Sequence, residues 1–117
     1  MEPKVNIDAL YAAMNATRIE RGMSWRQVAG ELGVSPSTLT RMAQAKRPDV
    51  DAFAAMIAWV KLPAERFMIT PSDPEPGDPM AEVIAILHGH PRLDARETRV
   101  LENVLSAAYR SLRGGRS

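Results

Sequence analysis

Apolar side chains recur at every third or fourth position along most of the chain, which is the spacing of one face of an α-helix. In the first segment, residues 7–21, Leu10, Met14 and Thr17 fall on one stripe, and Gly22 follows where a helix commonly ends. No alternating run of β-branched residues is long enough to indicate a strand. The pattern therefore predicts an all-α protein.

Two short helices follow in close succession. Ser24 is a suitable N-cap for a helix over residues 25–32, because its hydroxyl can accept a hydrogen bond from an unpaired backbone N–H. Ser35 takes the same position before a helix over residues 36–44, which begins with a proline that needs no N–H there. This third helix carries one arginine and three hydroxyls, and those polar groups raise the question of what it contacts.

A fourth helix begins after Pro48, with Asp49 as its N-cap, and a short fifth helix spans residues 63–68. The apolar residues of the fourth helix recur at helical spacing, at Val50, Phe53, Ile57 and Val60. Together the five helices predict a compact bundle over residues 1–69.

The composition changes abruptly after this bundle. Residues 70–79 hold four prolines, one glycine and three acidic side chains, which cannot sustain a helix and predict a semi-rigid linker. Residues 80–88 are strongly apolar, and Asp94 with Glu97 forms a capping box for a long helix that ends at about residue 113. Residues 80–117 are therefore expected to form a helical hairpin appended to the bundle.

Composition places the chain among globular proteins. It has 117 residues, of which 45% are hydrophobic and 25% charged, and it contains no cysteine that could form a disulfide or a thiolate metal site. The first residues lack the features of a signal peptide, and the longest apolar run, residues 52–60, is too short to span a bilayer. We therefore expect a cytoplasmic protein with no membrane association.

The net charge of +1 hides a strong local asymmetry. Residues 18–47 hold six basic side chains against two acidic ones, whereas residues 48–82 hold two basic against seven acidic ones. A concentrated basic surplus indicates an anionic partner more clearly than the whole-chain value does. The surplus surrounds the second and third helices.

The window from Trp25 to Gln44 has the spacing of two helices that cross at a steep angle. A small residue, Ala29, stands fifth where the helices approach most closely, and a flexible one, Gly33, stands ninth in the turn. Apolar residues fill the remaining packing positions, the fourth, eighth, tenth, fifteenth and eighteenth: Val28, Leu32, Val34, Leu39 and Met42. This complete set predicts a helix-turn-helix.

The stretch MSWRQVAGELGVSPSTLTRMAQAKRPDVDAFAAMIAWVKLPAERF resembles the helix-turn-helix domain of the lambda-repressor-like family, also called XRE or Cro-type regulators. The resemblance covers about residues 7–69. It implies a five-helix bundle that binds double-stranded operator DNA, usually as a dimer, with the third helix in the major groove. It further implies that base edges are contacted by Ser37, Thr38 and Arg41. Independently, an arginine on this helix can donate two hydrogen bonds to guanine.

The residues expected to contact DNA phosphates are Arg18, Ser24, Trp25, Arg26, Ser35, Gln44, Lys46 and Arg47. Three positions depart from the family pattern. Trp25 stands where a glutamine is usual, and its indole either donates to a phosphate or packs on a sugar. Ala43 stands where a glutamate often pairs with the arginine at Arg18, which leaves that arginine free for phosphate. Pro36 replaces a residue that contacts bases in some relatives, so fewer bases are expected to be contacted.

Other chemistry finds little support in the sequence. No Ser-His-Asp set, paired carboxylates or phosphate-binding loop stands out, so neither catalysis nor a cofactor is expected. His88 and His90 have no further ligand at suitable spacing, and we interpret them as a polar helix end rather than a metal site.

The last helix has an apolar stripe formed by Val100, Leu101, Val104, Leu105, Ala108 and Leu112. It either packs on the protein's own bundle or pairs with a second copy, and we favour a homodimer because the linker separates it from a bundle that is already complete. The sequence thus predicts a dimeric, nucleoid-associated repressor that binds an inverted repeat. The alternative is an antitoxin or adaptor whose C-terminal helices bind another polypeptide, with DNA binding secondary.

Overall fold

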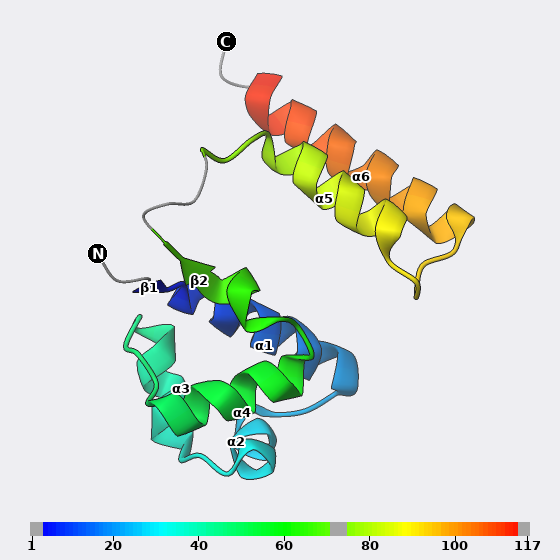
Figure 1. The fold of residues 1–117 in the computed structure, drawn as a ribbon. Helices are drawn as coiled ribbons and strands as arrows, with labels where there is room; N and C mark the ends of the chain where they lie inside the picture. The colour runs from blue at the N-terminus through cyan, green and yellow to red at the C-terminus, as the bar shows by residue number, and fades with distance from the viewer. Residues whose placement is uncertain (1–3, 71–74, 115–117) are drawn as a thin grey trace. The chain divides into compact units, whose positions relative to one another are not determined.

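The structure is a computed structural model that describes residues 4–70 and 75–114 (Figure 1). The chain divides into two compact units, Met1–Asp73 and Pro74–Ser117, which we call the N-terminal and C-terminal units. Helices dominate both units, which confirms the predicted all-α class. Residues 71–74 of the predicted linker lie outside the described residues, and residues 75–78 have no regular secondary structure.

The helices of the N-terminal unit are α1 (Ile7–Arg21), α2 (Trp25–Leu32), α3 (Pro36–Ala43) and α4 (Val50–Val60). Each of the first two ends at a glycine in the left-handed conformation, Gly22 with φ 66° and Gly33 with φ 75°. That conformation strains any residue with a Cβ atom, so glycine ends the helix and redirects the chain at little cost.

Within the N-terminal unit, the predicted capping residues act at two of the three helix starts after α1, those of α2 and α4. Ser24 and Gln27 form a reciprocal capping box on α2, and Asp49 accepts a hydrogen bond of 2.8 Å from the backbone N–H of Ala52 on α4. Ser35 stands at the N-cap of α3, but its hydroxyl bonds to neighbouring hydroxyls instead of a backbone N–H. The predicted side-chain cap of α3 is therefore absent.

The core of the N-terminal unit gathers one face from each helix. Packing of α1 and α2 against α3 and α4 buries a continuous apolar cluster. Its most deeply buried large members are Leu10, Met14, Val28, Met42 and Met56. Three of these are methionines, whose flexible side chains fill irregular spaces between crossing helices.

The face that α4 buries differs from the one predicted. Val50 is 82% exposed, and Phe53 and Ile57 are only partly buried. The buried residues of α4 are Ala52, Met56, Trp59 and Val60. Because nearly every position of α4 is apolar, spacing alone does not select a face, and the neighbouring helices decide which stripe is covered.

Two short strands close the N-terminal unit and were not predicted. β1 (Lys4–Val5) pairs antiparallel with β2 (Met68–Ile69), and the Asn6 N–H donates to the Phe67 carbonyl at 2.7 Å. The predicted fifth helix is a single 3-10 turn, Ala64–Phe67, that leads directly into β2. Two-residue strands leave no periodicity in a sequence, which explains why the pattern missed them.

The C-terminal unit is the predicted hairpin of α5 (Pro79–Gly89) and α6 (Ala95–Gly114), which pack against each other (Figure 1). The capping box is present, because the Glu97 N–H donates to Asp94 at 2.7 Å and the Asp94 N–H to Glu97 at 3.0 Å. Thr98 is the only buried residue among residues 75–114. None of the described helices combines the length and apolar character needed to cross a membrane.

Candidate nucleic-acid interface

The α3 helix has one buried face and one exposed face. Leu39 and Met42 are 3% and 1% exposed and pack in the core, whereas Ser37 and Arg41 lie in solvent. Residues four apart lie on the same side of a helix, so Ser37 and Arg41 share one face. This face carries a charged group that can donate several hydrogen bonds and a hydroxyl that can donate or accept.

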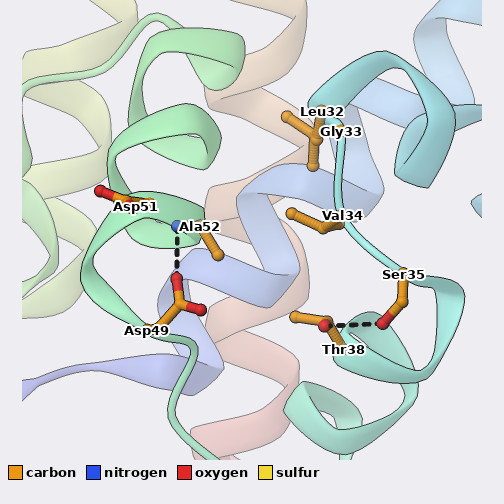
Figure 2. Close-up of a pocket in the computed structure, with 8 residues that line it drawn as sticks. All are labelled: Leu32, Gly33, Val34, Ser35, Thr38, Asp49, Asp51 and Ala52. Atoms are coloured by element: carbon orange, nitrogen blue, oxygen red, sulfur yellow. Dashed lines mark hydrogen bonds between the residues drawn. The ribbon is translucent and has the colours of Figure 1, made fainter.

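Hydroxyl groups cluster at the start of α3. The Ser35 Oγ lies 2.9 Å from the Ser37 Oγ and 3.0 Å from the Thr38 Oγ1. Thr38 is half-buried and, as Figure 2 shows, lines a pocket opposite Asp49 at the start of α4. Of the three predicted base-contacting residues, Ser37 and Arg41 are thus the exposed pair, and Thr38 lies at the edge.

That pocket has the wrong charge for a phosphate. Asp49 and Asp51 both line it, and the Asp49 carboxylate already caps the backbone of Ala52 (Figure 2). A DNA phosphate would meet two carboxylates there. Contacts with DNA are therefore expected on the exposed face of α3 and not in the pocket behind it.

Trp25 begins α2 inside a stack of three side chains. Its ring lies 4.8 Å from the Tyr11 ring, centroid to centroid, at an interplanar angle of 16°. The Arg18 guanidinium carbon lies 5.0 Å from the Trp25 ring. Trp25 therefore contacts an aromatic ring and a cation, both supplied by α1.

Arg18 is bound within the protein, which corrects the expectation that it is free. Its Nε and Nη2 donate to Asn15 Oδ1 at 3.0 and 2.8 Å, and its Nη1 donates to the Met23 carbonyl at 3.0 Å. Asn15 thus takes the place of the glutamate that the family often provides. Whether Arg18 also contacts a phosphate stays a prediction.

The basic turn after α3 has a defined backbone. Ala45 adopts a left-handed φ of 63°, and the Lys46 N–H donates to the Arg41 carbonyl at 3.0 Å. Gln44, Lys46 and Arg47 are all exposed. The turn therefore presents two positive charges directly beyond the C-terminal end of α3.

Comparison with known protein families also identifies the helix-turn-helix. Residues 15–58 match a family model described as Helix-turn-helix. This segment is therefore similar to helix-turn-helix domains, as its resemblance to lambda-repressor-like regulators predicted. The match includes α2 and α3 completely and parts of α1 and α4, but α5 and α6 lie outside it. No similar curated protein and no similar solved structure was found.

The match supports DNA binding by this helix-turn-helix segment. Ser24, Arg26 and Ser35 are exposed, as a DNA contact requires, although the Ser24 hydroxyl also accepts a hydrogen bond of 3.1 Å from the Gln27 N–H. The predicted phosphate contacts themselves remain untested.

Sequence reasoning missed Tyr11 and Asn15 as supports for Trp25, and it expected Arg18 only to contact a phosphate. Tyr11, Asn15 and Arg18 stand at intervals of four and three, which places them on one face of α1. That spacing is the signal that could have revealed them, although this stripe of α1 contains no aliphatic residue.

A second cation–aromatic contact joins three helices of the domain. Arg21 from α1 lies 4.8 Å from the Trp59 ring on α4, and the Trp59 indole N–H donates to Glu31 on α2 at 3.1 Å. Arg21 also lies 3.9 Å from Glu31. These side chains connect α1, α2 and α4.

The residues of the predicted dimer interface on α6 lie at the surface of the C-terminal unit. Val104 and Leu112 are 60% and 72% exposed, and Leu101 and Leu105 are 38% and 37% exposed. Val100 and Ala108 are exposed as well. His88 on α5 lies 2.6 Å from Glu102 on α6, so its role within the described residues is to pair the two helices.

Proposed function

We propose that this protein is a sequence-specific transcriptional regulator that binds operator DNA with α3 in the major groove. One observation carries the proposal. Within a helix-turn-helix domain, α3 buries Leu39 and Met42 and leaves Arg41 and Ser37 in solvent on a shared face. A helix of this kind fits the major groove, where each base pair has a distinct pattern of donors and acceptors.

Arg41 and the basic turn have different tasks in this proposal. Arg41 donates two hydrogen bonds to a guanine, and Ser37 with Thr38 adds contacts to neighbouring base edges or phosphates. Lys46 and Arg47 neutralise phosphates beside the groove, which fixes the position of the domain without reading sequence.

We further propose that the C-terminal unit forms a homodimer, so that two domains bind an inverted repeat. Support comes from the hairpin itself, in which Thr98 is the only buried residue among those described. Two helices with no buried apolar residue have little hydrophobic stabilisation of their own. A second hairpin would complete a four-helix arrangement with an apolar centre.

The distribution of exposure along α6 supports a second copy as the occupant. At about 100° per residue, Leu101 and Leu105 turn toward the α5 side, whereas Val100 and Val104 turn away from it. The first pair is less exposed than the second. The apolar band of α6 is wider than a single neighbouring helix can cover. Such a band is typical of a bundle helix that contacts two neighbouring helices.

Binding to duplex DNA tests the proposed function. A pool of random duplexes is selected on the full chain, and the affinity for the recovered sequence is compared with that for random duplex over a range of salt. We expect nanomolar specific binding and a slope of about −5 in log affinity against log salt if a dimer neutralises about six phosphates. A slope near zero would contradict DNA binding, and a recovered site without twofold symmetry would contradict the dimer.

Repression follows most simply if the dimer occupies DNA that polymerase needs. A reporter downstream of the recovered site is expected to lose expression when the protein is supplied, and increased expression would instead make it an activator. If the full chain is monomeric and copurifies with one other polypeptide at fixed stoichiometry, the antitoxin or adaptor hypothesis replaces the homodimer.

A further inference from the structure

The Trp25 ring is packed against two side chains of α1. Tyr11 stacks at 4.8 Å and Arg18 lies 5.0 Å from the ring centre, yet Trp25 remains partly exposed. The polar group that this partly exposed side chain can offer a partner is the indole N–H, which lies at the edge of the ring.

The indole N–H of Trp25 has no hydrogen-bond acceptor within residues 4–70 and 75–114. No described residue accepts a hydrogen bond from it, whereas the N–H of Trp59, the other tryptophan, donates to Glu31 at 3.1 Å. Tryptophan N–H groups usually find a partner, and a partly exposed one finds water until a ligand replaces it. The acceptor must therefore come from outside the described residues.

The charge around this donor selects an anion. Arg18 holds its positive charge over the ring, because Asn15 and the Met23 carbonyl fix its guanidinium through three hydrogen bonds. Residues 18–47, which include Trp25, carry four more basic than acidic side chains. An anionic oxygen at the ring edge would gain a charge-assisted hydrogen bond.

We infer that Tyr11 and Arg18 are positioning residues that clamp Trp25 so that its indole N–H donates to a phosphate of the DNA backbone. The inference rests on the proposed DNA-binding function and decides between the two roles open for Trp25. It also gives Arg18 a role through Trp25 instead of a direct contact. A tryptophan that is already fixed loses little rotamer freedom on binding. The clamp therefore lowers the entropic cost of the contact.

Nuclear magnetic resonance of the full chain reports the contact directly, with a short random-sequence duplex as the probe. The two tryptophans give two indole N–H signals, assigned with the Trp25→Phe variant. We expect the Trp25 signal to shift and its solvent exchange to slow when duplex is added, while the Trp59 signal serves as internal control. An unmoved Trp25 signal in a protein that binds the duplex would overturn the inference.

Affinity measurements with the same duplex test the clamp. Trp25→Phe keeps the stack and removes the N–H, and it should weaken binding about tenfold, as loss of a hydrogen bond to a charged group does. Tyr11→Phe should bind like the wild type, because its ring stacks equally well. Tyr11→Leu should lose most of the affinity for duplex DNA that Trp25→Phe loses. Arg18→Lys should also weaken binding, because an ammonium keeps the charge but not the planar, multiply bonded group.

The possible outcomes separate this inference from the proposed function. If the wild type does not bind duplex DNA, the proposed function fails and the clamp has no purpose. If the wild type binds and Trp25→Phe and Tyr11→Leu bind equally well, the clamp is refuted while DNA binding stands. Thermal unfolding of each variant shows whether it is folded. Wild-type affinity in Tyr11→Phe would show that stacking of the ring, and not the phenolic hydroxyl, supports Trp25.

Discussion

The indole nitrogen of Trp59 lies 3.1 Å from Oε1 of Glu31, and this hydrogen bond connects α4 to α2. Trp59 is 8% exposed, so few water molecules can replace Glu31 as the acceptor. The Arg21 guanidinium covers the same ring at 4.8 Å. The bond thus fixes α2, the first helix of the motif, to the core.

Replacing Glu31 by alanine should lower the free energy of unfolding by about 1 kcal/mol, because the Trp59 N–H loses its acceptor. Glu31→Gln should be nearly neutral, since the amide oxygen can accept the same bond. Urea denaturation measures both variants, and Glu65→Ala, at an exposed site, is the matched control. Equal stability of Glu31→Ala and Glu65→Ala would show that the bond contributes nothing.

Two glycines of the motif should respond to alanine in opposite directions. Gly33 has a φ of 75°, so Gly33→Ala should destabilise the domain by about 1 kcal/mol or more through backbone strain, although a Cβ atom would meet nothing within 4 Å. Gly30 lies inside α2 with the same open surroundings, and Gly30→Ala should stabilise it by about 0.5–1 kcal/mol. Thermal unfolding of the two variants tests this prediction. A melting temperature that changes in the same direction in both variants would contradict it.

The bounds of α1 and α2 could be predicted from sequence because the residues that begin and end these helices act locally. Gly22, Ser24 and Gly33 act within a few residues of themselves, and the structure places helix ends at each of them. The buried face of α4 could not be predicted, since it depends on which neighbours pack against an almost wholly apolar helix. The β1–β2 pairing joins residues far apart in the chain, and no local signal marks it.

The interface was predictable only in part for the same reason. The exposed positions of Ser37 and Arg41 follow from helical spacing around Leu39 and Met42. The tie between Arg18 and Asn15 depends on side-chain conformations that spacing does not specify. The family pattern places the partner of Arg18 at Ala43, whereas the structure places it at Asn15, on α1 itself.

Arg41 should contribute to sequence recognition, whereas Lys46 should contribute to sequence-independent binding of the DNA backbone. Arg41→Ala should cost about 1–3 kcal/mol at the selected operator and leave binding to random duplex nearly unchanged. Lys46→Ala should weaken binding to both duplexes similarly and reduce the salt slope by about one. Fluorescence anisotropy measures both variants, with exposed Arg66→Ala as the charge-matched control. If Arg41→Ala weakens both duplexes equally, Arg41 is an anchoring residue.

The proposed homodimer should depend on the face of α6 that turns away from α5. Val104 is 60% exposed in the single chain, so Val104→Asp should leave the monomer folded, but it would bury a charge in an apolar dimer interface at a cost of several kcal/mol. The neighbouring Asn103 is also exposed and lies about 100° away around the helix, so Asn103→Asp adds the same charge outside the apolar stripe. Sedimentation at micromolar concentration should give a dimer for the wild type and Asn103→Asp and a monomer for Val104→Asp. The monomeric variant should also bind the inverted repeat more weakly and without cooperativity, because its two domains are no longer linked. A wild type that is monomeric, or a Val104→Asp variant that still dimerises, would mean that this stripe does not join two copies.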